Sequence, residues 1–207
     1  MYPYKSVPLP LMTLKELQSN LKTPIFNLQE VAKLFPTESK NTINMQIKRM
    51  INRGDLERIR NGLYRLPNTR VDEYVLANLL YQPSYVSLET VLNNLGVIPD
   101  ITMNVTSITT VTSKIISTTA GTFLYSKIAK DLYYGFDKIK DSGSSYYCDV
   151  ACVEKALLDL IYVRRVRSLG EYRFDFSDVN AGKLNALAEK FPRWVKEVLN
   201  EQFKILV

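Results

Sequence analysis

Two groups of polar and basic side chains near the start of the chain have the types and spacing needed to bind nucleic acid. The first group comprises Lys40, Asn41, Thr42, Asn44, Lys48 and Arg49. Asparagine can bond adenine through two atoms, whereas lysine can reach guanine or a phosphate. In helix-turn-helix proteins, residues near the amino-terminal end of the recognition helix approach the base edges. These side chains are therefore predicted to contact double-stranded DNA.

The second group surrounds an Asn-Gly pair and comprises Arg58, Arg60, Asn61 and Arg65. Alternation along a strand puts Arg58 and Arg60 on one face, opposite Ile59. Two like charges on one face suit a phosphate backbone better than a hydrophobic core. We therefore expect this segment to bind DNA phosphates beside the predicted recognition helix.

Two helices are needed to position the first group. Asn27 is a suitable N-cap for a helix from Leu28 to Phe35. A second helix is predicted from Lys40 to Arg53, with Thr37 or Ser39 as its N-cap. Its apolar stripe, which we expect to face the core, comprises Ile43, Ile47, Met50 and Ile51.

A hairpin is needed to position the second group. Gly54 would end the second helix in a left-handed conformation. Strands are predicted at Leu56–Arg60 and Leu63–Leu66, joined by Asn61-Gly62. An Asn-Gly pair between strands favours a type I′ turn, in which both residues have positive φ.

Two further elements complete the first seventy residues. Leucines at helical spacing predict a helix over Pro10–Leu21, and Ile25-Phe26 is predicted to add a short strand to the hairpin. The resulting order is helix, strand, helix, helix, strand, strand. This is the order of a winged helix-turn-helix domain.

The charge of the chain is divided unevenly. Residues 1–70 hold 12 Lys and Arg against 5 Asp and Glu, a net charge of +7, whereas residues 71–207 have a net charge of −1. A basic small domain beside a nearly neutral larger one is typical of a DNA-binding module joined to a second, regulatory module. The alternative is a basic surface that is merely solvated.

The rest of the chain predicts a larger α/β domain over residues 71–207. Helices are expected at Val71–Tyr81, Leu88–Leu95, Val150–Val163, Gly182–Phe191 and Arg193–Phe203, and strands at Asn104–Thr109, Ile115–Thr119, Thr122–Ile128 and Leu132–Phe136. Ser87 and Asp149 are the expected N-caps of the second and third of these helices. The whole chain is therefore predicted to be mixed α+β, with a winged domain over residues 1–70.

The residue types argue against an enzyme. The sequence contains no histidine, which excludes the commonest general base and metal ligand. Neither of the glycine-rich phosphate-binding patterns, GxxxxGK[ST] and GxGxxG, occurs in the sequence. Cys148 and Cys152 lack the partners of a zinc site, and Asp149, Glu154 and Asp159 are better explained as an N-cap and a polar helix edge. We expect neither a metal nor a cofactor.

Composition bounds the location. No run of 18 apolar residues occurs, so no transmembrane helix is expected. The first residues lack the pattern of a signal peptide, and two cysteines do not make a disulfide framework. A cytoplasmic protein is expected.

A third basic group remains open. Arg164, Arg165 and Arg167 follow the predicted helix over Val150–Val163. Cations near a helix carboxyl terminus interact favourably with its dipole. The alternative is contact with an acidic partner.

Several segments resemble AbiEi-type antitoxins. Leu56–Arg65 resembles the wing of that family. Ser84–Leu92, the Thr-rich section with Gly121-Thr122-Phe123, and the "EKALLDL" of Glu154–Leu160 resemble its second domain. The resemblance covers roughly residues 12 to 165, and the tail after Arg167 matches no pattern.

The resemblance implies a bacterial antitoxin and transcriptional repressor. Such proteins bind repeats in their own promoter through the winged domain, and their second domain counters an AbiEii-type nucleotidyltransferase toxin. The system is of type IV, in which antitoxin and toxin need not form a stable complex, and is associated with abortive infection by phage. The alternatives are a winged protein-docking module, a transcription regulator without antitoxin activity, and a nucleic-acid-modifying enzyme.

Overall fold

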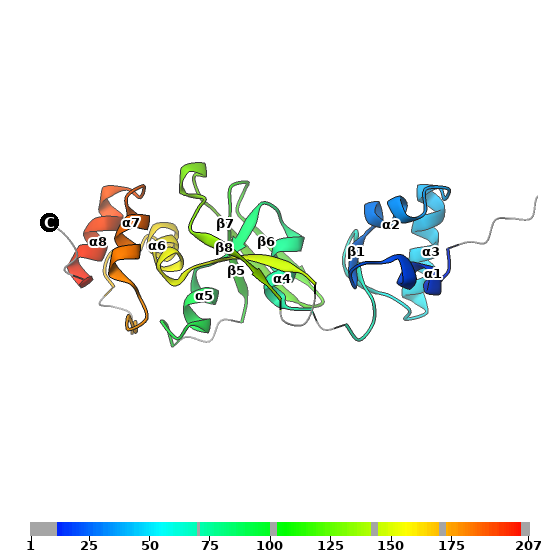
Figure 1. Ribbon diagram of the computed structural model, residues 1–207, viewed down its shortest axis with the longest axis horizontal. Helices are drawn as coiled ribbons and strands as arrows, with labels where there is room; N and C mark the ends of the chain where they lie inside the picture. The colour runs from blue at the N-terminus through cyan, green and yellow to red at the C-terminus, as the bar shows by residue number, and fades with distance from the viewer. Residues whose placement is uncertain (1–11, 70, 100–102, 142–144, 170–172, 204–207) are drawn as a thin grey trace, which may run out of the picture. The chain divides into compact units, whose positions relative to one another are not determined.

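The computed structural model describes residues 12–69, 71–99, 103–141, 145–169 and 173–203 (Figure 1). The chain divides into two compact units, Met1–Arg70 and Val71–Val207, called here the first and second units. Each has helices and its own β-sheet, so the prediction of a mixed α+β fold is confirmed.

The first unit has the predicted order of elements. Its described part forms α1 (Leu14–Asn20), β1 (Ile25–Asn27), α2 (Leu28–Leu34), α3 (Lys40–Asn52), β2 (Glu57–Arg60) and β3 (Leu63–Arg65). Strand β3 lies between β1 and β2 and is antiparallel to both. The assignment of this unit as a winged helix-turn-helix stays a prediction.

Side-chain caps determine where the helices begin. Asn27 Oδ1 accepts from the backbone N–H groups of Gln29 and Glu30, and Glu30 accepts from the N–H of Asn27. This reciprocal capping box fixes the start of α2 where the sequence predicted it. Of the two predicted caps of α3, Ser39 is the one that accepts from an N–H group, that of Thr42.

Helix α1 is shorter than the prediction of Pro10–Leu21. Thr13 and Glu16 form a second capping box, so the helix begins at Leu14. The backbone of Leu21 is extended, so the helix ends before it. Pro10 lies outside the described residues.

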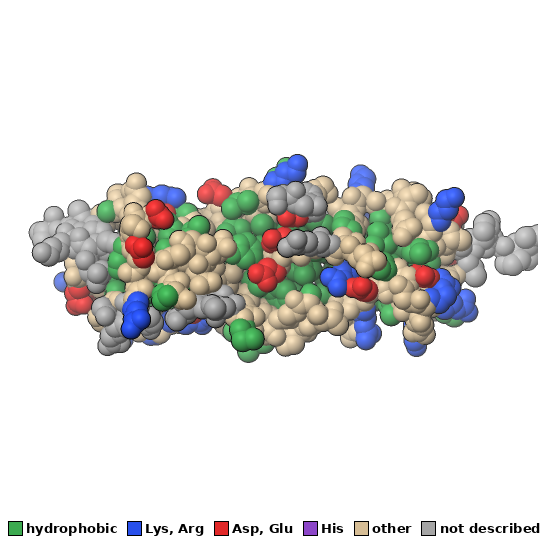
Figure 2. Space-filling model, turned by 90° about the horizontal axis from the view of Figure 1, so that it is seen from below, with side chains coloured by type: hydrophobic (Ala, Val, Ile, Leu, Met, Phe, Trp, Pro, Cys, Tyr) green, Lys and Arg blue, Asp and Glu red, His purple; other side chains and the backbone are tan. Residues whose placement is uncertain are grey.

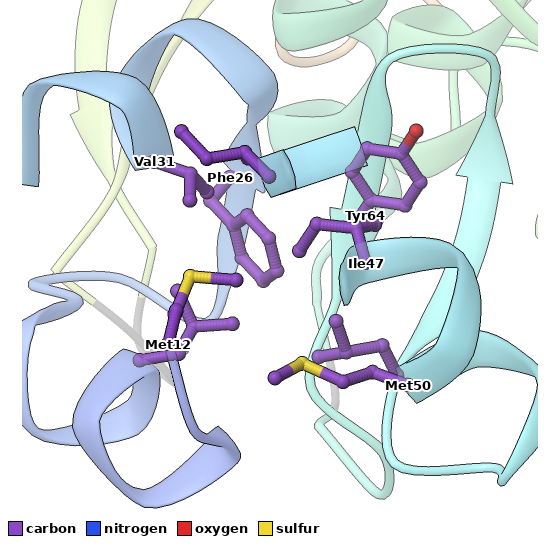
Figure 3. Packing of buried hydrophobic residues seen from close by; sticks show 9 residues of the cluster. Met12, Phe26, Val31, Ile47, Met50 and Tyr64 are labelled. Atoms are coloured by element: carbon purple, nitrogen blue, oxygen red, sulfur yellow. The ribbon is translucent and has the colours of Figure 1, made fainter. Parts of the chain in front are cut away.

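A hydrophobic core draws buried residues from α1, β1, α2, α3 and β3 of the first unit and includes Leu56, which precedes β2 (Figure 3). Phe26 of β1 packs against Tyr64 of β3, with ring centroids 6.0 Å apart. Ile47 and Met50 of α3 are 1% and 2% exposed, so the predicted apolar stripe faces this core. Ile51 is only half-buried, at the edge of the same cluster.

The hairpin turn differs from the predicted type I′. Gly62 has φ of +81°, but Asn61 is not among the described residues with positive φ. The strand register shifts between Arg58 and Arg60, so one strand carries a β-bulge. A bulge increases the local twist of a strand pair, and the hairpin therefore closes without a second left-handed residue.

The second unit is built on a six-stranded mixed sheet with the order β6-β7-β5-β4-β9-β8. Its strands are β4 (Ser84–Val86), β5 (Val105–Thr109), β6 (Lys114–Thr118), β7 (Gly121–Lys127), β8 (Phe136–Lys140) and β9 (Tyr147–Ala151). Its helices are α4 (Glu73–Leu80), α5 (Glu89–Asn94), the 3₁₀ turn η1 (Lys130–Leu132), α6 (Val153–Arg164), α7 (Ala181–Ala188) and α8 (Arg193–Phe203). Strand pairs β4–β9 and β5–β7 are parallel, and the other pairs are antiparallel.

Helices cover both faces of this sheet. Tyr85 OH of β4 donates to Asp159 of α6 at 2.9 Å, and Tyr125 OH of β7 donates to the carbonyl of Ala77 in α4 at 2.7 Å. Tyr85 pairs with Ile108 of β5, and Tyr125 pairs with Ser107, the residue before it. Adjacent side chains of a strand point to opposite faces, so α4 and α6 pack on opposite sides.

Several predicted boundaries in the second unit are wrong, among them the end of the helix predicted over Gly182–Phe191, which lies at Ala188. Leu132–Phe136 is not a strand, because its first residue ends the 3₁₀ turn and β8 begins only at Phe136. The helix predicted from Val150 begins at Val153, and Asp149 is a strand residue rather than an N-cap. The backbone N–H of Asp149 donates to Asn78 Oδ1 at 2.6 Å, so a tertiary contact holds it in the sheet.

Ser87 is also not the helix cap that the sequence predicted. Its hydroxyl donates to Asp159 Oδ2 at 2.8 Å, and Leu88 precedes α5 with φ of +60° and without a side-chain cap. Burying a carboxylate without hydrogen-bond donors costs more free energy than leaving the start of a short helix without a side-chain cap. The hydroxyl of Ser87 is therefore used on a partner 72 residues away.

Lys155 and Asp159 form a buried ion pair, and both side chains are 0% exposed. Lys155 Nζ lies 5.5 Å from the ring centroid of Tyr85, 5.3 Å from that of Tyr134 and 4.9 Å from that of Phe191. Burial raises the pKa of Asp159 and lowers that of Lys155, while the pair's mutual attraction opposes both shifts. The prediction that Glu154 and Asp159 lie on a polar helix edge is wrong, because they are 3% and 0% exposed.

We expect Lys155→Met to lower the free energy of unfolding of the second unit by about 3–5 kcal/mol, because it leaves the Asp159 carboxylate buried without its cation. Lys138→Met is the control, since Lys138 is 69% exposed and lies 3.9 Å from Asp149. Its cost should stay below about 1 kcal/mol. Urea unfolding followed by circular dichroism measures both, and equal costs would contradict a stabilising role for the buried pair.

Candidate nucleic-acid interface

One side of α3 carries exposed polar and basic side chains, called here the basic face of α3. Its members are Lys40, Asn41, Asn44, Lys48 and Arg49, all exposed. They are exposed because Ile43, Ile47 and Met50 turn the other side of the helix into the core. The structure therefore brings five of the six predicted helix contacts onto the surface together.

Thr42, the sixth predicted contact, has a structural role. Its N–H donates to Ser39 Oγ at 3.1 Å, and the two hydroxyl oxygens lie 2.8 Å apart. The side chain is half-buried. Thr42 therefore contributes to the helix start and is less available to a ligand than its neighbours.

A hollow of about 440 Å³ lies between α2 and α3, beside the basic face. It is lined by Leu28, Gln29, Ala32, Lys33, Lys40, Ile43 and Asn44. Sequence reasoning missed Gln29 and Lys33. Their spacing of four residues, which puts both on one side of α2, is the signal that could have identified them.

The arginines of the hairpin differ in their exposure and in their hydrogen bonds. Arg58 is exposed, and its Nη1 donates to Asn61 Oδ1 at 3.4 Å. Arg60 is half-buried, and its Nε is buried without a hydrogen-bond partner in the described structure. A buried donor without a partner is unfavourable, so Arg60 has unused hydrogen-bonding capacity.

Arg65 is already paired within the hairpin. Its Nε and Nη2 both lie 2.5 Å from Glu57 Oε2, on the neighbouring strand. The Arg65 side chain is 27% exposed. Of the predicted hairpin contacts, Arg65 therefore has the least charge to offer a phosphate.

Arg53 and Arg65 of the first unit have acidic partners, Asp55 and Glu57, whereas the exposed residues of the basic face have none among the described ion pairs. Figure 2 shows Lys and Arg side chains spread over the surface of the first unit, with Asp or Glu side chains beside some of them. Met45, which is 50% exposed, is an apolar residue among the polar ones of the basic face. Arg49 Nη2 donates to its sulfur at 3.8 Å. Such a surface suits the major groove of DNA, which presents thymine methyl groups between two phosphate backbones.

The third predicted group, Arg164, Arg165 and Arg167, lies in the second unit. Arg164 Nε and Nη2 donate to the two carboxylate oxygens of Glu89 at 2.6 and 3.0 Å. Arg165 ends α6 in a left-handed conformation, with φ of 58°. The remaining two guanidinium groups contact aromatic rings instead of carboxylates.

The cysteines belong to no group of metal-ligating side chains among the described residues. Burial raises the pKa of Cys148 to about 11, so its thiol stays protonated at neutral pH. Burial also raises the pKa of Cys152. In the described parts of the chain, no three Cys, Asp or Glu side chains are grouped to hold a metal ion.

None of the helices in the described part of the chain combines the length and apolar composition that crossing a bilayer requires. Comparison with known proteins finds no matching family model and no matching curated protein. The basic face and the hairpin are therefore interpreted from their own geometry.

We expect Asn44→Ala and Lys48→Ala to weaken binding to DNA taken from upstream of the protein's own reading frame. Lys48→Ala should weaken binding to all sequences alike, whereas Asn44→Ala should cost about 1–3 kcal/mol at preferred sites only. Gel shifts with that DNA and with a random duplex measure both effects.

Asn52→Ala is the matched control, because Asn52 is exposed at the far end of α3. All three positions lie outside the core, so circular dichroism should be unchanged. Asn52→Ala should bind both duplexes as the wild type does. If Asn44→Ala and Lys48→Ala also bind both duplexes as the wild type does, the basic face of α3 is not the DNA contact.

Proposed function

We propose that this chain is a DNA-binding antitoxin of the AbiEi type, which represses its own operon through the first unit. The observation that carries the proposal is the basic face of α3, beside an arginine-bearing hairpin in a segment with net charge +7. Double-stranded DNA is the proposed ligand, and repeats in the protein's own promoter are the proposed sites. The proposed location is the bacterial cytoplasm.

The dimensions of α3 support this role. The helix has thirteen residues and is therefore about 20 Å long. The major groove of B-DNA is wide enough to admit an α-helix. With α3 in the groove, the amide groups of Asn41 and Asn44 are the candidates for base contacts. Lys48 and Arg58 are the candidates for phosphate contacts.

We further propose that the second unit counters an AbiEii-type nucleotidyltransferase toxin. The support is the resemblance of Ser84–Leu92 and Glu154–Leu160 to that family. These segments meet in the structure, since Tyr85 and Ser87 both donate to Asp159. The toxin is a functional partner, and the proposal does not require a stable complex.

The proposed role requires no catalysis, which agrees with a sequence without histidine. The rival function is a winged module that docks on a protein. The half-exposed Met45 and the apolar floor of the hollow favour it, because apolar surface suits protein partners. Binding to an acidic or apolar protein surface would depend on salt less steeply than binding to DNA.

Replacing Arg58 and Arg60 together by Gln should flatten the slope of log K against log salt by about two units, roughly 0.9 for each phosphate that is no longer neutralised. Binding to duplex DNA is measured at several salt concentrations. Arg53→Gln is the control, because Arg53 Nε and Nη2 already contact Asp55 at 2.7 and 2.6 Å. Identical slopes for wild type and double variant would favour the protein-docking function.

Repression and antitoxin activity should be separable in the full chain. The variant Asn44→Ala/Lys48→Ala should lose most repression of a reporter fused to its own promoter. It should still rescue cells that express the cognate toxin, because the second unit is unchanged. Loss of rescue at equal protein levels would contradict the assignment of antitoxin activity to the second unit.

A further inference from the structure

Two arginines and two aromatic rings form a cluster where α6 ends and α8 begins. Arg165 Cζ lies 5.6 Å from the ring centroid of Tyr162 and 5.3 Å from that of Trp194. Arg167 Cζ also lies 5.3 Å from the Trp194 centroid. The two rings stack, with centroids 6.1 Å apart and planes 19° apart. These residues are called here the arginine–tryptophan cluster.

The backbone explains why both arginines reach the same ring. Arg165 leaves the helix in the left-handed region, with φ of 58°, and Val166 N–H donates back to the Ile161 carbonyl at 3.1 Å. Val166 is 5% exposed, so its side chain turns into the core. The residues on either side of it, Arg165 and Arg167, are exposed.

Both guanidinium groups lie near aromatic rings and, in the described part of the chain, make no hydrogen bond that would occupy their N–H groups. A guanidinium that stacks on a ring uses its flat face, whereas its N–H groups point outward in the plane. Among the described residues, neither Arg165 nor Arg167 has a carboxylate partner. Neighbouring arginines differ, since Arg164 donates to Glu89 and Arg193 to Glu197.

Two cations held over one ring repel each other, and the rings offset this only in part. A phosphate that both guanidinium groups reach would reduce this repulsion and accept hydrogen bonds from their N–H groups. Guanidinium groups bind phosphate through two parallel hydrogen bonds. Planes of arginine and aromatic rings are also what unpaired bases stack on. An acidic peptide would use the charge but not these planes.

We propose that the arginine–tryptophan cluster binds the phosphate groups of single-stranded RNA or of a free nucleotide. This site lies in the second unit and does not depend on the proposed contact of α3 with duplex DNA. It therefore adds a second nucleic-acid ligand to the chain, separate from the operator. Arg165 and Arg167 hold the phosphate, and Trp194 keeps both guanidinium planes in position.

The sequence supplies its own probe, because Trp194 is the single tryptophan of the chain. Tryptophan fluorescence of the full-length protein is measured during titration with a short oligouridylate, with uridine triphosphate and with polyglutamate. We expect a saturable change with the oligouridylate. A similar change with uridine triphosphate would identify a nucleotide as sufficient, and its absence would identify a strand as the ligand.

Arg165→Gln/Arg167→Gln should weaken the affinity by roughly a hundredfold, about tenfold for each charged hydrogen-bonding group removed. Arg193→Gln, beside Trp194 but paired with Glu197, is the matched control and should change the affinity less than twofold.

Three results would overturn the proposal: no fluorescence change with either phosphate probe, equal affinity of the double-arginine variant and the control, or tighter binding of polyglutamate. None of them bears on whether the first unit binds its operator, which gel shifts test separately.

Discussion

The second unit is organised around two opposite charges that no water reaches. Lys155 and Asp159 are both fully buried, and such a pair persists only if further groups satisfy it. Tyr85 in β4 and Ser87 just after it donate hydroxyl hydrogen bonds to the carboxylate, while aromatic rings surround the ammonium group. The pair therefore ties the centre of the sheet to α6 and to the chain that precedes α8. The first unit has no comparable polar centre among its described residues and is held by an apolar cluster.

Features with a local cause could be predicted from the sequence, and those with a distant cause could not. Asn27 and Ser39 cap helices because their side chains reach amides two or three residues ahead. Gly54 and Gly96 have positive φ where helices end, as expected of glycine there. The role of Ser87, by contrast, depends on a carboxylate 72 residues away. No sequence window contains that information.

The same distinction applies to the candidate interface. Helical spacing predicts the basic face of α3, because the apolar stripe leaves only one side of the helix for solvent. Spacing does not predict that Arg65 meets Glu57, since strand register decides that contact. The exposure of the basic face is a property of the structure, whereas its ligand remains a proposal. The three arginines at the end of α6 and just after it also differ in their neighbours: Arg164 contacts Glu89, and Arg165 and Arg167 contact Trp194.

Gly135, just before β8, has φ of +76°, and a Cβ there would lie 3.1 Å from Cγ and Cδ of Lys155. Glycine is favoured at this position on two independent grounds, backbone conformation and lack of space. The residue at position 155 therefore depends on glycine at position 135 more than glycine at position 135 depends on the lysine. A lineage that replaced Lys155 by a shorter residue would still favour glycine at 135. A lineage that lost the glycine would strain the backbone and crowd the lysine at once, so position 135 is the more tightly constrained of the two.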